Sequence, residues 1–186
     1  MYGIIIVLGI IGLIILWVIL AYNGLVTLKN QVENAWKQID VQLKRRYDLI
    51  PNLVNTVKGA MAFERDTLSK VIEARAKAMG AGSIADKGVA ENMLTEALGR
   101  LFMLVENYPD LKSNKNVLQL QEEITSTENR IGFARQFYND IVAQFNTKQS
   151  VFPTMIIAST FAFKKAEYFQ AGVAEREAPT VDLTLK

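Results

Sequence analysis

The chain opens with an apolar stretch that is long enough to cross a membrane. Residues 4–21 are all apolar, and the first charged side chain is Lys29. As a helix rising about 1.5 Å per residue, this stretch is roughly 27 Å long, which approaches the thickness of a hydrocarbon core. Tyr2, Trp17 and Tyr22 lie towards its two ends, where such rings favour the membrane interface. The pattern predicts one transmembrane helix.

Two other interpretations of this stretch fit less well. A cleaved signal peptide has basic residues before its apolar region and small residues before the cut, whereas here no Lys or Arg precedes the stretch and Ile19 and Leu20 precede Ala21. A buried core helix needs apolar residues on one face only, whereas residues 4–21 are apolar on every face. Because cations such as Lys29 and Lys37 follow the span, the positive-inside rule predicts a short N-terminus outside and a cytoplasmic C-terminal region.

Helical periodicity continues directly from the apolar stretch. Apolar residues recur every three or four positions from Leu25 to Ile50, and no Gly or Pro interrupts the chain between Gly24 and Pro51. The anchor is therefore expected to continue out of the membrane as one rod. At Pro51 either Asp48 caps a new helix or the proline kinks a continuous one, and a bend is expected in both cases.

Three further helices are predicted after Pro51. The second continues to Gly80 with Glu64 on its apolar face, and the third follows a Ser83–Asp86 capping box. The apolar face of the third helix is predicted at Val89, Met93, Ala97, Leu101, Leu104 and Tyr108. Tyr108-Pro109-Asp110 ends it, and Ser113 or Asn114 caps a fourth helix with an apolar series from Val117 to Phe145. Short connections favour antiparallel packing.

These elements predict an all-α fold in which an N-terminal transmembrane helix continues into an antiparallel bundle of about four long helices. We divide the chain into an anchor (1–26), a helical bundle (27–171) and an extended C-terminal tail (172–186). The uncharged segment Val151–Phe163 is too short for a second crossing and fits a buried turn, an interfacial segment or a subunit contact. The tail alternates apolar and polar residues from Pro179, which predicts a strand that pairs with another copy or docks in a groove.

Composition removes most catalytic chemistry. The chain contains no His and no Cys, which excludes His triads, Cys nucleophiles and the usual zinc ligands. With 21 basic and 19 acidic residues, the net charge of +2 gives no strong field for nucleic acid. We predict no enzyme, no catalytic, cofactor-binding or metal-binding residue and no nucleic-acid partner. The remaining enzymatic alternative is a hydrolase that uses only the carboxylates of Glu64, Glu106 and Glu128.

Several clusters combine aromatic, amide and charged residues within the predicted helices. In their order along nearly the whole chain, they resemble the bacterial LemA family. The residues of this signature are Arg45, Arg46, Asp48, Pro51, Asn52, Glu64, Glu106, Tyr108, Pro109, Asp110, Glu128, Asn129, Arg135, Tyr138, Asn139, Asp140, Phe152 and Pro153. The resemblance implies a small bacterial membrane protein with an N-terminal anchor and a long-helix bundle, and one family member takes part in magnetosome membrane formation.

The resemblance implies no established enzymatic activity and no catalytic residue. The family often has a His directly before the glutamate that corresponds to Glu64, and this chain has Phe63 there. From the residues alone, the signature favours structural ion pairs that fix helix register: Arg45 or Arg46 with Asp48, and Arg135 with Glu128 or Asp140. A polar groove for a ligand or partner is the alternative.

The sequence thus favours a non-enzymatic, single-pass protein of the bacterial inner membrane, a scaffold that self-associates and organises or remodels that membrane. A monomeric adaptor that binds a protein partner through a groove in the bundle is the alternative from another class.

Overall fold

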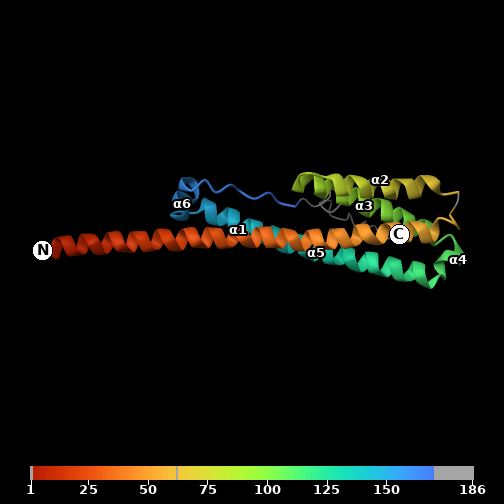
Figure 1. Ribbon diagram of the computed structural model, residues 1–186, viewed down its shortest axis with the longest axis horizontal. Helices are drawn as coiled ribbons and strands as arrows, with labels where there is room; N and C mark the ends of the chain where they lie inside the picture. The colour runs from red at the N-terminus through yellow and green to blue at the C-terminus, as the bar shows by residue number, and fades with distance from the viewer. Residues whose placement is uncertain (1, 62, 170–186) are drawn as a thin grey trace, which may run out of the picture. The chain divides into compact units, whose positions relative to one another are not determined.

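The computed structural model describes residues 2–61 and 63–169, and in these residues it contains helices and no strand. The helices are α1 (Tyr2–Val57), α2 (Arg65–Gly80), α3 (Ile84–Val105), α4 (Pro109–Lys112), α5 (Lys115–Ser150) and α6 (Thr154–Thr160) (Figure 1). The predicted all-α class is confirmed. The tail predicted as a strand lies outside the described residues.

The predicted continuation of the anchor into the first helix of the bundle is confirmed. Helix α1 is 56 residues long and includes both the apolar stretch and the amphipathic region that follows it. Among the described residues, α1 is the one helix that is long and apolar enough to cross a membrane. The side chains of the apolar stretch are largely exposed, as they are in a helix surrounded by lipid.

Helix α1 does not end at Pro51, so of the two alternatives for this proline the structure shows the continuous helix. The proline lies inside the helix, which continues to Val57, so Asp48 is not an N-cap. The chain instead turns between Val57 and Arg65, where Met61 N–H donates to the Val57 carbonyl at 3.0 Å. Glu64 occupies the N-cap position of α2 rather than a position within a helix. Helix α2 then ends at Gly80, where the glycines predicted a stop.

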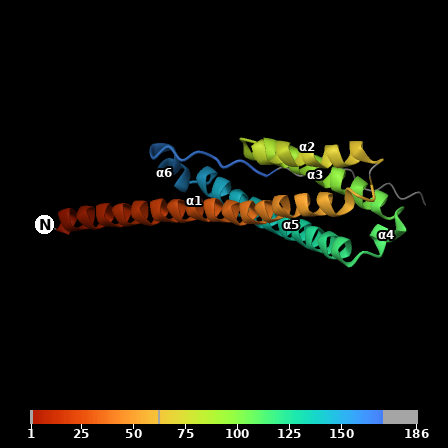
Figure 2. The same cartoon turned by 45° about the vertical axis from the view of Figure 1, so that its right-hand side comes forward.

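Helix α3 begins as predicted but buries a different face. Asp86 N–H donates to Ser83 Oγ at 3.0 Å, which confirms the cap. Val89 and Met93, predicted in the core, are exposed. The buried residues of α3 are Gly88, Ala90, Glu91, Leu94, Leu98, Leu101 and Val105. The helix has apolar residues on more than one side, so packing against α2, which lies beside it in Figures 1 and 2, selects the buried face.

The fourth predicted helix is α5. It is 36 residues long, and the Asn114 side chain caps it by accepting a hydrogen bond from Asn116 N–H at 2.9 Å. Most of its predicted apolar series is buried, including Val117, Ile124 and Phe145. The break at Tyr108-Pro109-Asp110 contains the short helix α4, with Pro109 at its first position, where a missing N–H is harmless.

The chain forms two compact units. Of the described residues, the first contains 2–41 and 132–168, and the second contains 42–61, 63–131 and 169. In the first unit α1 and α5 are antiparallel, because the Trp36 ring contacts Tyr138 at 5.6 Å between centroids while Lys148 lies beside Gly24. The second unit combines the end of α1 with α2, α3, α4 and the first half of α5.

Candidate functional site

The guanidinium of Arg46 is the centre of a buried polar cluster in the second unit. Arg46 projects from α1, and its side chain is only 1% exposed. Its Nη1 lies 3.2 Å from Glu91 Oε2 on α3 and 2.7 Å from Glu128 Oε2 on α5. Its Nη2 donates to Thr95 Oγ1 at 2.8 Å. One cation thus joins three helices that are distant in sequence.

Two hydroxyl groups complete this cluster. Tyr47, the next residue on α1, donates its hydroxyl proton to Glu91 Oε1, while Thr95 donates to Glu128 Oε1 at 2.9 Å. Each hydrogen bond has a defined direction, so a shift of one helix along another would break several of them. We call Arg46, Tyr47, Glu91, Thr95 and Glu128 the buried network.

The carboxyl group of Glu91 has an unusual protonation equilibrium. Burial raises its pKa above the ordinary value of 4.5, and the nearby Glu128 charge acts in the same direction. The hydrogen bond from Tyr47 and the charge of Arg46 lower the pKa, but burial is the largest effect. Arg46 and the Glu91 carboxyl group are buried, whereas the Glu128 side chain is 37% exposed. Contacts of one guanidinium with side chains of two other helices favour a fixed helix register.

The predicted pairing of Arg46 with Asp48 is wrong. Residues two apart on a helix do not face each other, and Arg46 is directed inwards while Asp48 is exposed. Arg45 pairs with Glu123 instead, across 3.9 Å at the surface. Glu91 was not predicted from the sequence, although it precedes Leu94, Leu98 and Leu101 at steps of three, four and three. A charged residue within an apolar helical series was the available signal.

The other signature residues lie in varied places. Tyr108 donates its hydroxyl proton to Glu64 Oε1 at 3.4 Å, and Tyr138 donates to the Glu167 carbonyl at 2.8 Å. Burial, with the Glu167 charge, raises the Tyr138 pKa to about 12. Besides Arg45 and Asp48, the exposed members of the signature are Asn52, Glu106, Pro109, Asp110, Asn129, Asp140 and Phe152. Half-buried members are Pro51, Arg135, Asn139 and Pro153.

The three carboxylates of the hydrolase alternative lie in three different settings. Glu64 contacts Tyr108, Glu128 belongs to the buried network, and Glu106 is exposed at the end of α3. Within residues 2–61 and 63–169, no group of three acidic side chains is arranged to hold a metal ion. The structure therefore gives this alternative no common site.

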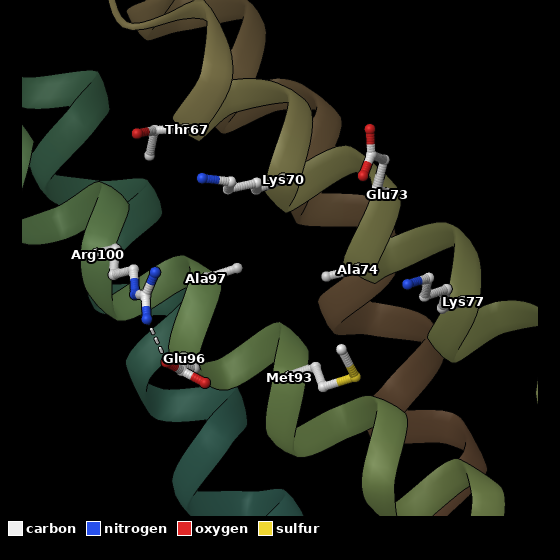
Figure 3. Close-up of a pocket in the computed structure, with 9 residues that line it drawn as sticks. All are labelled: Thr67, Lys70, Glu73, Ala74, Lys77, Met93, Glu96, Ala97 and Arg100. Atoms are coloured by element: carbon white, nitrogen blue, oxygen red, sulfur yellow. Dashed lines mark hydrogen bonds and ion pairs between the residues drawn. The ribbon is translucent and has the colours of Figure 1, made fainter.

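A polar groove of about 320 Å³ lies between α2 and α3, as Figure 3 shows. Ala74, Met93 and Ala97 form its apolar part, and charged side chains surround them. Arg100 holds Glu96 at 2.5 Å, and Lys70 holds Asp66 at the same distance. Three cations, Lys70, Lys77 and Arg100, line the groove together with Glu73 and Glu96, so it has mixed charge rather than a concentrated field for an anion.

A long apolar N-terminal helix and a second region of packed amphipathic helices define a membrane-associated helical protein with one candidate span. The sequence model of the LemA family matches residues 35–183. The chain belongs to the LemA family, as its residue clusters indicated. The matched residues include the whole buried network, whereas the anchor precedes them. Proteins of this family are not known as enzymes.

Individual relatives agree with the family assignment. The chain is 31% identical over 155 residues to Protein LemA of Metamycoplasma hominis, which covers 83% of this chain and 71% of that protein. It is 26% identical over 178 residues to magnetosome protein MamQ 2 of Paramagnetospirillum magneticum and 25% identical over 177 residues to MamQ of Magnetospirillum gryphiswaldense. These matches cover 82% and 81% of this chain but only 65% of each MamQ protein.

Proposed function

We propose that the protein is a non-enzymatic, membrane-anchored scaffold that self-associates and organises or remodels the bacterial inner membrane. Residues 1–26 span the bilayer once with the short N-terminus outside, and residues 27–171 form a cytoplasmic helical domain. The membrane and further copies of the chain are its partners.

The observation that carries this proposal is the continuity of α1. The same helix contains the candidate span and, without interruption, the residues that anchor the buried network. After Ala21 it continues for a further 36 residues, roughly 54 Å at 1.5 Å per residue. Within the first unit this helix packs against α5, so copies that associate through α5 bring their membrane spans together. This coupling is what a protein that organises a membrane requires.

The surface that we assign to self-association lies on α5. Phe133 and Phe137 are one turn apart on this helix and are 73% and 48% exposed. Neighbouring aromatic rings in water favour burial against another apolar surface. We assign a second copy of this chain as the occupant, because anchors confined to one bilayer raise the effective concentration of copies and make weak contacts sufficient. The similarity to the magnetosome proteins MamQ supports a membrane-organising role.

The mass of the full-length protein in mild detergent tests this proposal. Multi-angle light scattering should give a mass of several chains at micromolar concentration, and electron microscopy should show particles of defined form. Phe133→Asp with Phe137→Asp should reduce the mass towards that of one chain, because two charges replace the rings. Ile72→Asp with Met79→Asp adds the same charge to another exposed apolar pair, on α2, and should leave the assembly intact. A wild-type protein that is a monomer throughout would refute self-association.

The groove between α2 and α3 supports a second candidate, a monomeric adaptor tethered to the membrane. Its mixed charges and small apolar floor suit a helical peptide of opposite charge pattern more than a small anion. In that case, full-length wild-type protein should capture one partner in equal stoichiometry from a membrane extract. Ala74→Arg with Ala97→Arg should abolish capture, whereas Phe133→Asp with Phe137→Asp should not.

A further inference from the structure

The segment after α5 combines exposed apolar side chains with basic flanks. Residues 149–163 contain no charged residue, and Lys148 on one side and Lys164 and Lys165 on the other bound them. Phe152 is 77% exposed, and Met155, Ile156 and Phe161 are about half exposed. Thr154, Ile157 and Ala158 are buried, so the opposite side of α6 holds the segment in place. We call residues 151–163 the α6 segment.

The α6 segment lies at the end of the membrane span. Tyr22 directly follows the apolar stretch of α1, and its ring centroid is 4.8 Å from that of Phe161 and 5.8 Å from that of Phe163. Lys148 lies beside Gly24, two residues further along α1. This position follows from topology: α1 leaves the membrane, α5 is antiparallel to it, and the turn after α5 therefore returns to the membrane side.

We propose that the α6 segment is a second membrane contact, in which Phe152, Met155, Ile156 and Phe161 insert into the interface of the leaflet that Tyr22 faces. Lys148, Lys164 and Lys165 then bind the head groups of anionic phospholipids. Apolar side chains next to exposed cations are the combination by which an interfacial segment recognises an anionic bilayer. Lysine stems add apolar surface at that depth while their charges stay in water.

Lipid is a better occupant than a second copy for two reasons. The α6 segment is fixed within one unit beside Tyr22, so the bilayer is its nearest apolar phase whenever α1 spans the membrane. Its three flanking lysines would repel the same lysines of a second copy, whereas they attract phosphate groups. This inference rests on the membrane attachment in the proposed function and not on self-association. Two contacts, the span and the α6 segment, would fix the tilt of the first unit on the bilayer.

Spin labels provide the test, because the natural chain has no cysteine. Phe152→Cys and Ile156→Cys are made in the full-length protein and labelled with a nitroxide. They are then placed in nanodiscs of phosphatidylcholine with or without phosphatidylglycerol. Paramagnetic relaxation by oxygen, which enters the bilayer, is compared with relaxation by a water-soluble nickel chelate. Gln38→Cys on the exposed side of α1 reports the aqueous phase, and Ile11→Cys reports the span.

The labels at 152 and 156 should show an oxygen-to-nickel ratio several-fold above that of the label at 38. A ratio equal to that at 38, with a high ratio at 11, would overturn this inference and leave the anchor in place. A low ratio at 11 as well would overturn the attachment itself. Protection from both reagents that increases with the protein-to-lipid ratio would assign the segment to a second copy and also overturn the inference.

A charge reversal tests the lipid recognition. In nanodiscs with phosphatidylglycerol, Lys164→Glu with Lys165→Glu should lower the oxygen-to-nickel ratio at 152 towards its value in phosphatidylcholine alone. Lys112→Glu with Lys115→Glu reverses two exposed cations at the other end of α5 and should leave the ratio unchanged. Equal ratios in both lipids for the wild-type protein would refute recognition of anionic phospholipid.

Discussion

Arg75 on α2 donates a hydrogen bond from Nε to the backbone carbonyl oxygen of Tyr47 on α1, across 2.8 Å. In an α-helix the amide N–H four residues later bonds this carbonyl, but here that residue is Pro51, which has no N–H. The guanidinium therefore supplies the donor that the proline removes. This explains how α1 continues through Pro51, and why Arg75 occurs within the otherwise apolar side of α2.

Removal of the Arg75 guanidinium should destabilise the protein through that carbonyl. Arg75→Met should lower the free energy of unfolding by about 1 kcal/mol, since a hydrogen bond to a part-buried group is lost. In a Pro51→Ala background, where residue 51 regains its N–H, the same substitution should cost less. Urea unfolding of the four proteins in detergent, followed by circular dichroism, measures the coupling. Equal costs in both backgrounds would show that the two residues act independently.

Two adjacent arginines should differ greatly in their contribution to stability. Arg46→Met leaves Glu91 buried without its cation and should cost about 3–5 kcal/mol. Arg45→Met removes only a surface ion pair and should cost less than about 1 kcal/mol. Thermal unfolding of both variants in the same detergent compares them. A similar decrease in Tm for the two would contradict the central role of the buried network.

Stability should depend on pH through Glu91. Because the folded state has the raised pKa, it retains a proton at pH values at which the unfolded chain has lost it. The stability that Glu91 contributes is therefore complete below pH 4.5 and is lost as pH rises from 4.5 through the raised pKa. Glu91→Gln cannot ionise, so its Tm relative to wild type should increase with pH. Glu122→Gln, at an exposed position, should show the same dependence of Tm on pH as the wild-type protein. A difference in Tm between Glu91→Gln and wild type that stays constant with pH would refute the role of Glu91.

The orientation of the anchor has a direct test in cells. With Tyr2→Cys, a membrane-impermeant maleimide should label the protein in intact spheroplasts, because the N-terminus is proposed to lie outside. With Asn30→Cys, just beyond the span, labelling should require lysis. The cysteine-free parent gives the background. The reverse pattern would place the bundle outside the cytoplasm and contradict the proposed topology.

Much of the fold was predictable because its signals are local. The apolar stretch up to Ala21, the cap at Ser83 and the series from Val117 to Phe145 each depend on residues close in sequence. For the site, the residues predicted structural ion pairs that fix helix register, but with Asp48 as the candidate partner of Arg45 or Arg46, and with Glu128 or Asp140 as that of Arg135. Glu91, the buried partner of Arg46, was not predicted, because no spacing rule connects an arginine and a glutamate 45 residues apart.

By itself, the sequence determined the helical class, the candidate membrane span at the start of α1 and the exclusion of His and Cys chemistry, because periodicity and composition need no knowledge of neighbours. Only the tertiary structure decided the passage of α1 through Pro51, the buried face of α3 and the joining of Arg46 to Glu91. A proline in a helix is tolerated when another element supplies the missing donor, and a helix apolar on two sides is oriented by what packs against it. A buried charge, likewise, is stable only beside a partner brought by another helix.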